Sequence, residues 1–122
     1  MVHAVEELTR RTRGVNVEMM VAQLSRYLRG WRGYFGFCQT PSMLRSLDKW
    51  LRRRLRSVVW KQWKRGKVRF AELRKRGVSH DLAAQTAGSA HGPWRLSESP
   101  ALHIALPKAY FASLGLTPLV VN

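Results

Sequence analysis

The chain has 122 residues, which gives room for a single hydrophobic core and excludes a multidomain enzyme. Hydrophobic residues make up an ordinary 45%, whereas 22 Lys and Arg against 7 Asp and Glu leave a formal net charge of +15. Such an excess of cations calls for a polyanionic partner, RNA or DNA before an anionic membrane surface.

The charge is concentrated in the first part of the chain. Residues 1–76 hold 20 Lys and Arg and 5 Asp and Glu, whereas residues 77–122 hold two of each sign. We therefore expect three parts: a basic lead-in over residues 1–15, a helical domain over 16–77, and a near-neutral tail with short helices over 78–122.

The first predicted helix follows the lead-in. Asn16 is a suitable N-cap, and apolar residues recur from Val17 to Trp31 at the spacing of one amphipathic helix face. Gly30, Gly33 and Gly36 then interleave with aromatic residues. Because glycine lets another backbone approach closely, we expect a tightly packed corner there.

The second predicted helix is the longest. Thr40 and Pro41 give its start signal, and a leucine-rich stripe continues to about Trp63. Basic residues fall on roughly the opposite side, with Trp60 and Trp63 in the same arc. The helix is therefore expected to have one apolar face and one cationic face that carries aromatic rings.

Shorter elements complete the predicted fold. Residues 68–76 read as a third helix stopped by Gly77, and Ser79 with Asp81 caps a fourth over 82–87. Residues 88–100 read as an ordered loop pinned by Trp94 or as a linker, and 102–106 and 108–114 as two helical pieces. With no strand-like alternation, the fold class is all-α: a small bundle of about three main helices followed by short C-terminal helices.

Sites for catalysis and metals find little support. The acidic residues are scattered without an adjacent Asp pair, and the four histidines lack metal-ligand spacing. Cys38, the single cysteine, reads as a small core residue and fits a reducing compartment. We expect no enzyme activity, no metal and no cofactor.

The basic stripe over residues 45–76 carries the functional prediction. It holds 14 Lys and Arg but only two acidic residues, Asp48 and Glu72. Most of its cations therefore lack the i,i+4 acidic partner that is common on an ordinary solvated helix. Trp60 and Trp63 either stack on exposed bases or pack under the third helix. The candidate nucleic-acid-binding residues are Arg11, Arg13, Arg45, Lys49, Arg52, Arg53, Arg54, Arg56, Trp60, Lys61, Lys64 and Arg65.

Three co-linear runs match a known family. LRGWRGYF from Leu28, LDKWLRRRLR from Leu47 and WKQWK from Trp60 resemble the maturase-specific domain, also called domain X or thumb, of group II intron-encoded reverse transcriptases. This resemblance covers about residues 8–65. GPWRLS over 92–97, PALHIALP over 100–107 and AYFASLGL over 109–116 resemble the tail that follows the domain in many bacterial members.

The resemblance implies a helical thumb that grips template and primer, binds intron RNA and helps the ribozyme splice. By that analogy the stripe from Arg45 to Arg56, with Lys61, Lys64 and Arg65, follows the sugar-phosphate backbone. The aromatic corner of Trp31, Tyr34 and Phe35 would lock the first two helices. The family's palm and fingers, its paired catalytic aspartates and its zinc-bearing endonuclease are missing here, so polymerase activity does not carry over.

The sequence thus predicts an RNA-binding module of maturase type in the bacterial cytoplasm. Its expected partners are group II intron RNA, an RNA/DNA template-primer and a separate palm-and-fingers polypeptide, and self-association is an open option; no membrane is expected. Two alternatives stay open: an accessory subunit that completes a reverse transcriptase split over two chains, and a generic basic DNA-binding protein.

Overall fold

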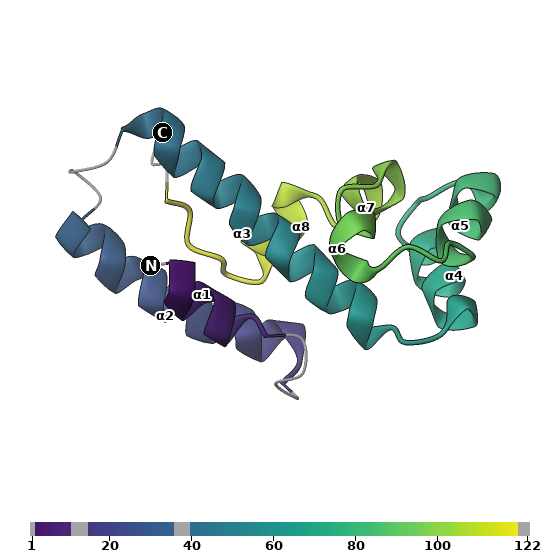
Figure 1. Cartoon of the computed structure of the whole chain (residues 1–122), viewed down its shortest axis with the longest axis horizontal. Helices are drawn as coiled ribbons and strands as arrows, with labels where there is room; N and C mark the ends of the chain where they lie inside the picture. The colour runs from purple at the N-terminus through teal and green to yellow at the C-terminus, as the bar shows by residue number, and fades with distance from the viewer. Residues whose placement is uncertain (1, 11–14, 36–39, 120–122) are drawn as a thin grey trace.

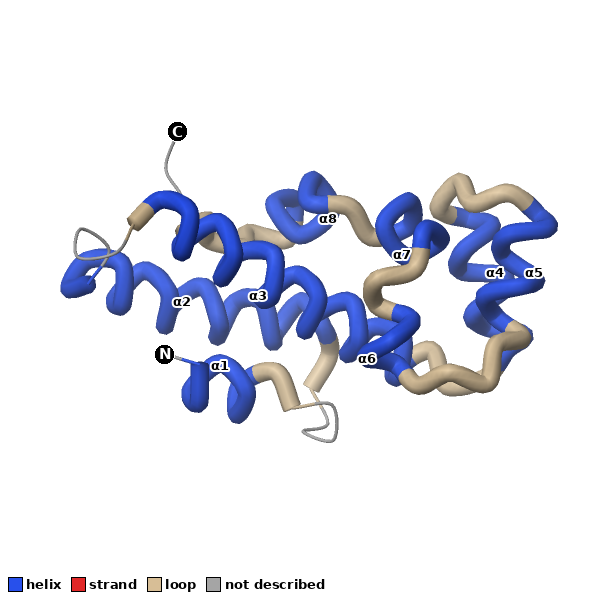
Figure 2. Tube along the Cα trace, turned by 45° about the horizontal axis from the view of Figure 1, so that its top comes forward, coloured by secondary structure: helices blue, strands red, loops and turns tan. Residues whose placement is uncertain are grey.

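The predicted all-α class is confirmed. The computed structural model describes residues 2–10, 15–35 and 40–119, and within these ranges it contains helices and loops but no strand (Figures 1 and 2). The helices are α1 (Val2–Leu8), α2 (Val17–Phe35), α3 (Pro41–Gln62), α4 (Gly66–Lys75), α5 (His80–Ala87), α6 (Pro93–Leu96), α7 (Pro100–Ala105) and α8 (Lys108–Ser113).

Two long antiparallel helices form the frame of the molecule. α2 and α3 make a helical hairpin, and α1 lies along α2 (Figure 1). α4 and α5 pack together beyond the C-terminal end of α3, and α6 rests on α3. The chain then returns through α7 and α8, so that residues 116–119 run back towards the start of α3 (Figure 1).

The predicted capping residues are confirmed. Asn16 Oδ1 accepts a hydrogen bond from Met19 N at 2.8 Å at the start of α2, and Thr40 Oγ1 accepts one from Met43 N at 3.3 Å at the start of α3. Gly77 has a φ of 93°, a left-handed conformation that ends the α4 region without the strain a side chain would add.

Two segments differ from the sequence prediction or refine it. Residues 2–8 fall in the predicted lead-in, yet they form α1, whose Val5 is fully buried. Seven residues are too few for a helix that is stable alone, so packing holds it in place. For residues 88–100 the sequence left an ordered loop and a linker open; the segment is ordered, because it contains α6.

The prediction of close backbone approach is wrong for Gly30 and Gly33. Among the described residues, a Cβ atom added to either glycine would meet nothing within 4 Å, and both residues are exposed on α2. Trp31 is half-buried and packs against the core. Gly36 and Cys38, with the side chains of Tyr34 and Phe35, lie outside the described residues.

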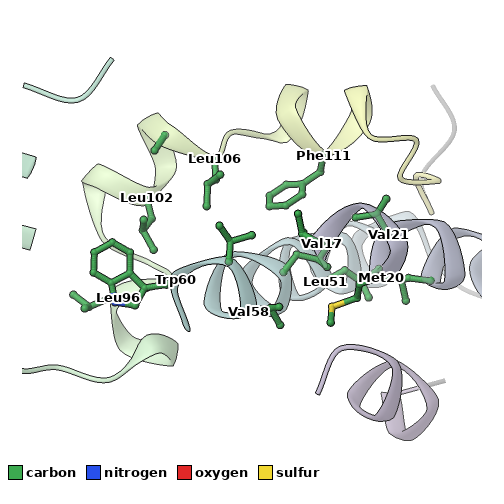
Figure 3. Close-up of a cluster of buried hydrophobic side chains, with 14 of the residues drawn as sticks. Val17, Met20, Val21, Leu51, Val58, Trp60, Leu96, Leu102, Leu106 and Phe111 are labelled. Carbon is green, nitrogen blue, oxygen red and sulfur yellow. The ribbon is translucent and has the colours of Figure 1, made fainter. Parts of the chain in front are cut away.

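The C-terminal residues share one hydrophobic core with the hairpin. Leu24, Leu51 and Leu55 of α2 and α3 are fully buried, and so are Leu102 and Phe111 of the tail. Figure 3 shows the tail side chains directed at the side chains of α2 and α3. Residues 96–119 therefore complete the packing of the two long helices.

A closing segment, residues 115–119, is hydrogen-bonded to both α2 and α3. Ser25 Oγ donates to Gly115 O at 2.9 Å and accepts from Thr117 N at 3.0 Å. Arg32 Nη1 donates to Pro118 O at 2.8 Å, and Asp48 Oδ1 accepts from Leu119 N at 3.0 Å. Because α2 and α3 side chains satisfy these backbone groups, the segment is held without secondary structure of its own.

We expect Phe111→Ala to lower the free energy of unfolding by about 3–5 kcal/mol, as removal of a fully buried aromatic side chain from a shared core does. Ile104→Ala is the matched control, because this side chain is half-exposed on the neighbouring α7 and should cost within about 0.5 kcal/mol. Urea unfolding followed by circular dichroism measures both. Equal stabilities would mean that α8 is not part of the cooperative core.

Candidate nucleic-acid interface

The cationic face predicted for α3 is interrupted by the tail. In the first half of α3, Arg45, Ser46 and Lys49 are exposed, as an amphipathic helix requires. From Leu55 to Trp60 every residue is buried, whichever way it points. α2 covers one side of this half, and α6, α7 and α8 cover the arc that the sequence assigned to solvent (Figure 1).

Arg56 belongs to the core, and its predicted place on the free cationic face is wrong. It is 5% exposed, and its Nε donates to Leu106 O at 2.9 Å. Burial lowers the pKa of Arg56, as does the neighbouring Arg52, while Glu98 acts in the opposite direction. An arginine remains charged under these conditions, so Arg56 is a buried cation that serves as the donor for a backbone carbonyl.

Trp60 is packed rather than presented to a ligand. Its side chain is fully buried, and the guanidinium group of Arg69 from α4 lies 4.6 Å from its ring centroid. Arg69 Nε also donates to Trp60 O at 3.2 Å, and the ring meets Trp63 edge-on at 5.9 Å. The sequence left two alternatives for Trp60, packing under the helix that follows α3 or stacking on a base. Packing is confirmed, and the buried ring is not accessible to a base.

Arg53 and Arg54 are half-buried connectors between helices. Arg53 Nε donates to Ser97 Oγ at 3.1 Å and its Nη2 to Trp94 O at 3.0 Å, which fixes α6 on α3. Arg54 Nε donates to Thr9 Oγ1 at 3.1 Å and its Nη2 to Glu6 O at 3.2 Å, which fixes the end of α1. A planar guanidinium with five donors suits such bridging better than an ammonium group does.

The other predicted cations remain available to a ligand. Within the described part of the chain, their side chains make no hydrogen bond or ion pair, and all are exposed except the half-exposed Arg52. They fall into two groups. The first group lies within residues 45–52 of α3 and comprises Arg45, Lys49 and Arg52. The second group lies at the α3–α4 turn and comprises Lys61, Lys64, Arg65 and also Lys67, which the sequence-based selection missed.

At about 1.5 Å of rise per residue, the nearest members of the two groups, Arg52 and Lys61, are separated by about 14 Å along α3. This exceeds the Debye length of about 8 Å at physiological ionic strength, so the two groups act as separate anchors. Arg11 and Arg13 lie outside the described residues.

Lys64 has an unusual backbone conformation. Its φ of 55° makes it the one non-glycine residue with positive φ in the described part of the chain. It stands just after α3, where glycine is preferred, and it turns the chain into α4. A lysine in this position therefore costs stability and adds a cation to the second group.

Other classes of site lack support in the described ranges. Over residues 2–10, 15–35 and 40–119, no three His, Cys, Asp or Glu side chains gather as a metal site would require. None of the helices in those ranges has the length and apolar character needed to cross a membrane.

The structure thus defines a basic helical hairpin with two groups of free cations, closed by a C-terminal extension. Residues 1–77 match the family described as "Group II intron, maturase-specific domain". The match covers more than half of the chain, so the protein belongs to this family, and the predicted resemblance over residues 8–65 is confirmed. The resemblance of residues 92–116 to the family's tail lies beyond the match and stays a prediction. The maturase-specific region is distinct from the catalytic palm of these proteins. A search of curated proteins finds no match.

The division between structural and free arginines predicts different costs of substitution. Arg56→Met should lower the free energy of unfolding by about 1–3 kcal/mol, because it leaves the buried Leu106 carbonyl without its donor. Arg45→Gln should change the stability by less than about 0.5 kcal/mol, because its side chain is exposed. Chemical denaturation of both variants measures the difference, and equal values would contradict the division.

Lys64→Gly should raise the stability by about 0.5–1 kcal/mol. Relief of the left-handed strain, about 1–2 kcal/mol, outweighs the cost of glycine flexibility in the unfolded chain, about 0.5–1 kcal/mol. Lys64→Ala is the control, because it removes the charge and keeps the strain. Thermal unfolding of the two variants checks the prediction, which fails if glycine and alanine give equal stabilities.

Proposed function

We propose that the chain is an RNA-binding module of maturase type that holds group II intron RNA by its sugar-phosphate backbone. The family supports an intron RNA as the partner. The observation that carries the proposal is the set of exposed cations on α3 and at the α3–α4 turn that have no partner among the described residues. In the part of the chain that the structure describes, these cations make no contact that stabilises the fold.

The contrast with the structural arginines strengthens this assignment. Arg53, Arg54 and Arg56 are bound to backbone or side-chain oxygens, so part of the net charge is accounted for by the fold itself. The second group instead places four cations within residues 61–67 with no acidic residue among them. Mutual repulsion there lowers stability, and contact with phosphates would relieve it while releasing counterions.

The proposed mode of action is positioning without chemistry. α3 is a continuous helix of 22 residues, so it holds the two groups of cations at a fixed separation. Phosphate contacts at two separated points orient an RNA segment without reading its sequence. Such an anchor would assist a ribozyme to fold and splice, and the same surface would suit a template-primer helix in a complete reverse transcriptase.

Binding should depend steeply on salt. With about six phosphate contacts, the affinity for a structured intron RNA should fall about 10³-fold between 50 and 200 mM salt. Changing Arg45, Lys49, Lys61 and Arg65 to Gln should weaken binding. It should also reduce the slope of log K against log salt by up to about 0.9 for each phosphate that is no longer neutralised. Fluorescence anisotropy titrations across the salt range measure both effects.

Two comparisons make this test specific. Lys61→Gln with Arg65→Gln should weaken binding more than Lys75→Gln with Lys108→Gln, which removes the same charge from exposed positions on α4 and α8. Random duplex DNA should compete more weakly than intron RNA. Equal effects of the two double variants would refute the interface, and equal competition would favour the generic DNA-binding alternative. Primer extension gained on mixing with a palm-and-fingers chain would favour the accessory-subunit alternative.

A further inference from the structure

An exposed tryptophan contacts α3 at Arg53, four residues beyond Lys49. Trp94 on α6 is 38% exposed, in contrast to the fully buried Trp60. We propose that the indole ring of Trp94 is a stacking platform for an unpaired RNA base. This inference rests on the proposed function and adds to it the class of RNA that the surface recognises: segments with unpaired bases.

The ring is held in place from one side. The guanidinium carbon of Arg53 lies 3.9 Å from the Trp94 ring centroid, a distance typical of cation–π stacking. Arg53 is itself fixed by its hydrogen bonds to Trp94 O and Ser97 Oγ. Because Arg53 covers one face of the indole, a base would stack on the opposite face. A base that stacks there would therefore meet a side chain that is already ordered.

The support under the ring is rigid although the ring itself is exposed. Leu96 and Ser97, which follow Trp94 closely, are buried, and Ser97 Oγ also donates to Trp94 O. The core thus fixes the backbone of α6 and leaves the indole at the surface. An exposed indole on an ordered backbone loses little conformational freedom on binding, which favours affinity.

The position along α3 brings the ring next to phosphate-binding groups. Arg53 follows Lys49 by four residues, so the two side chains are neighbours on the same face of α3. The Arg53 side chain on which Trp94 stacks therefore begins about one helical turn beyond Lys49. Arg95, also exposed, comes next in the chain. An RNA strand anchored at Lys49 has its next bases within reach of the indole.

Local charges favour a base over a phosphate at this point. Glu98 Oε1 lies 3.5 Å from Arg53 Nε, so a carboxylate offsets the guanidinium charge beneath the ring. A phosphate would be repelled by Glu98, whereas the face of a neutral base would not be. Stacking on a tryptophan tolerates any of the four bases, but it requires a base that is free of a duplex stack.

The test compares three RNA probes of 12 units: single-stranded oligouridine, the same sugar-phosphate chain without bases, and a fully paired duplex. The wild-type protein should bind oligouridine more tightly than the abasic chain. Trp94→Leu should weaken oligouridine binding by about 5- to 150-fold, the range for loss of one aromatic–base stack. It should leave abasic-chain and duplex binding unchanged, because the phosphate contacts remain. Trp94→Phe should keep most of the affinity for oligouridine.

Controls separate stacking from a general defect. Ile104→Ser removes another exposed apolar side chain, from α7, and should change none of the three affinities. Circular dichroism and thermal unfolding report whether Trp94→Leu is folded, and Trp94→Phe provides a variant that keeps an aromatic ring on Arg53. Wild-type binding that does not distinguish oligouridine from the abasic chain overturns the stacking platform alone. Absence of binding to all three probes overturns the proposed function with it.

Discussion

The burial of residues 55–60 of α3 on all sides is the constraint on which the rest of the structure depends. A helix with a cationic arc can be enclosed only if its charged groups find oxygen atoms inside the protein. Arg56 does so through the Leu106 carbonyl, and Arg53 through the Trp94 carbonyl and the Ser97 hydroxyl. The C-terminal residues thus supply both apolar side chains and acceptors to the helix that they cover.

The same constraint sorts the basic residues by role. Where the tail or α1 contacts α3, arginine side chains bridge elements that are far apart in the sequence, as Arg54 does between α3 and Thr9. Where no described element covers the cationic face of α3, at Arg45 and Lys49, the cations project into solvent. Net charge therefore overstates the cations available to RNA, and the geometry of the two free groups is the better guide to the interface.

Local signals made most of the helix boundaries predictable. Asn16, Thr40 and Ser79 act through hydrogen bonds to backbone groups three residues away, and Gly77 acts through its own φ angle. Such effects do not depend on the rest of the fold. α1 escaped prediction because its seven residues owe their helical state to tertiary contacts, such as that of the buried Val5.

The candidate site was only partly predictable for a related physical reason. Helical periodicity places Arg45, Lys49, Arg53 and Arg56 on one arc, but it cannot show which part of the arc another element covers. That depends on contacts such as Arg53 with Trp94, across 41 residues of sequence. The near-neutral composition of residues 77–122 was the available signal, because a segment with few charges and many apolar residues has a surface to bury.

Contacts in the core cross the point where the family match ends. The maturase-specific match ends at residue 77, yet the side chain of Arg56 donates a hydrogen bond to the carbonyl of Leu106, beyond that point. If the later residues were removed, Arg53 and Arg56 would lose their acceptors and α3 would present more of its cationic arc to solvent. With them in place, the cations are confined to two separated groups, with an ordered indole beside the first. The extension therefore shapes the surface that the family-defining helices offer to a ligand, in addition to stabilising them.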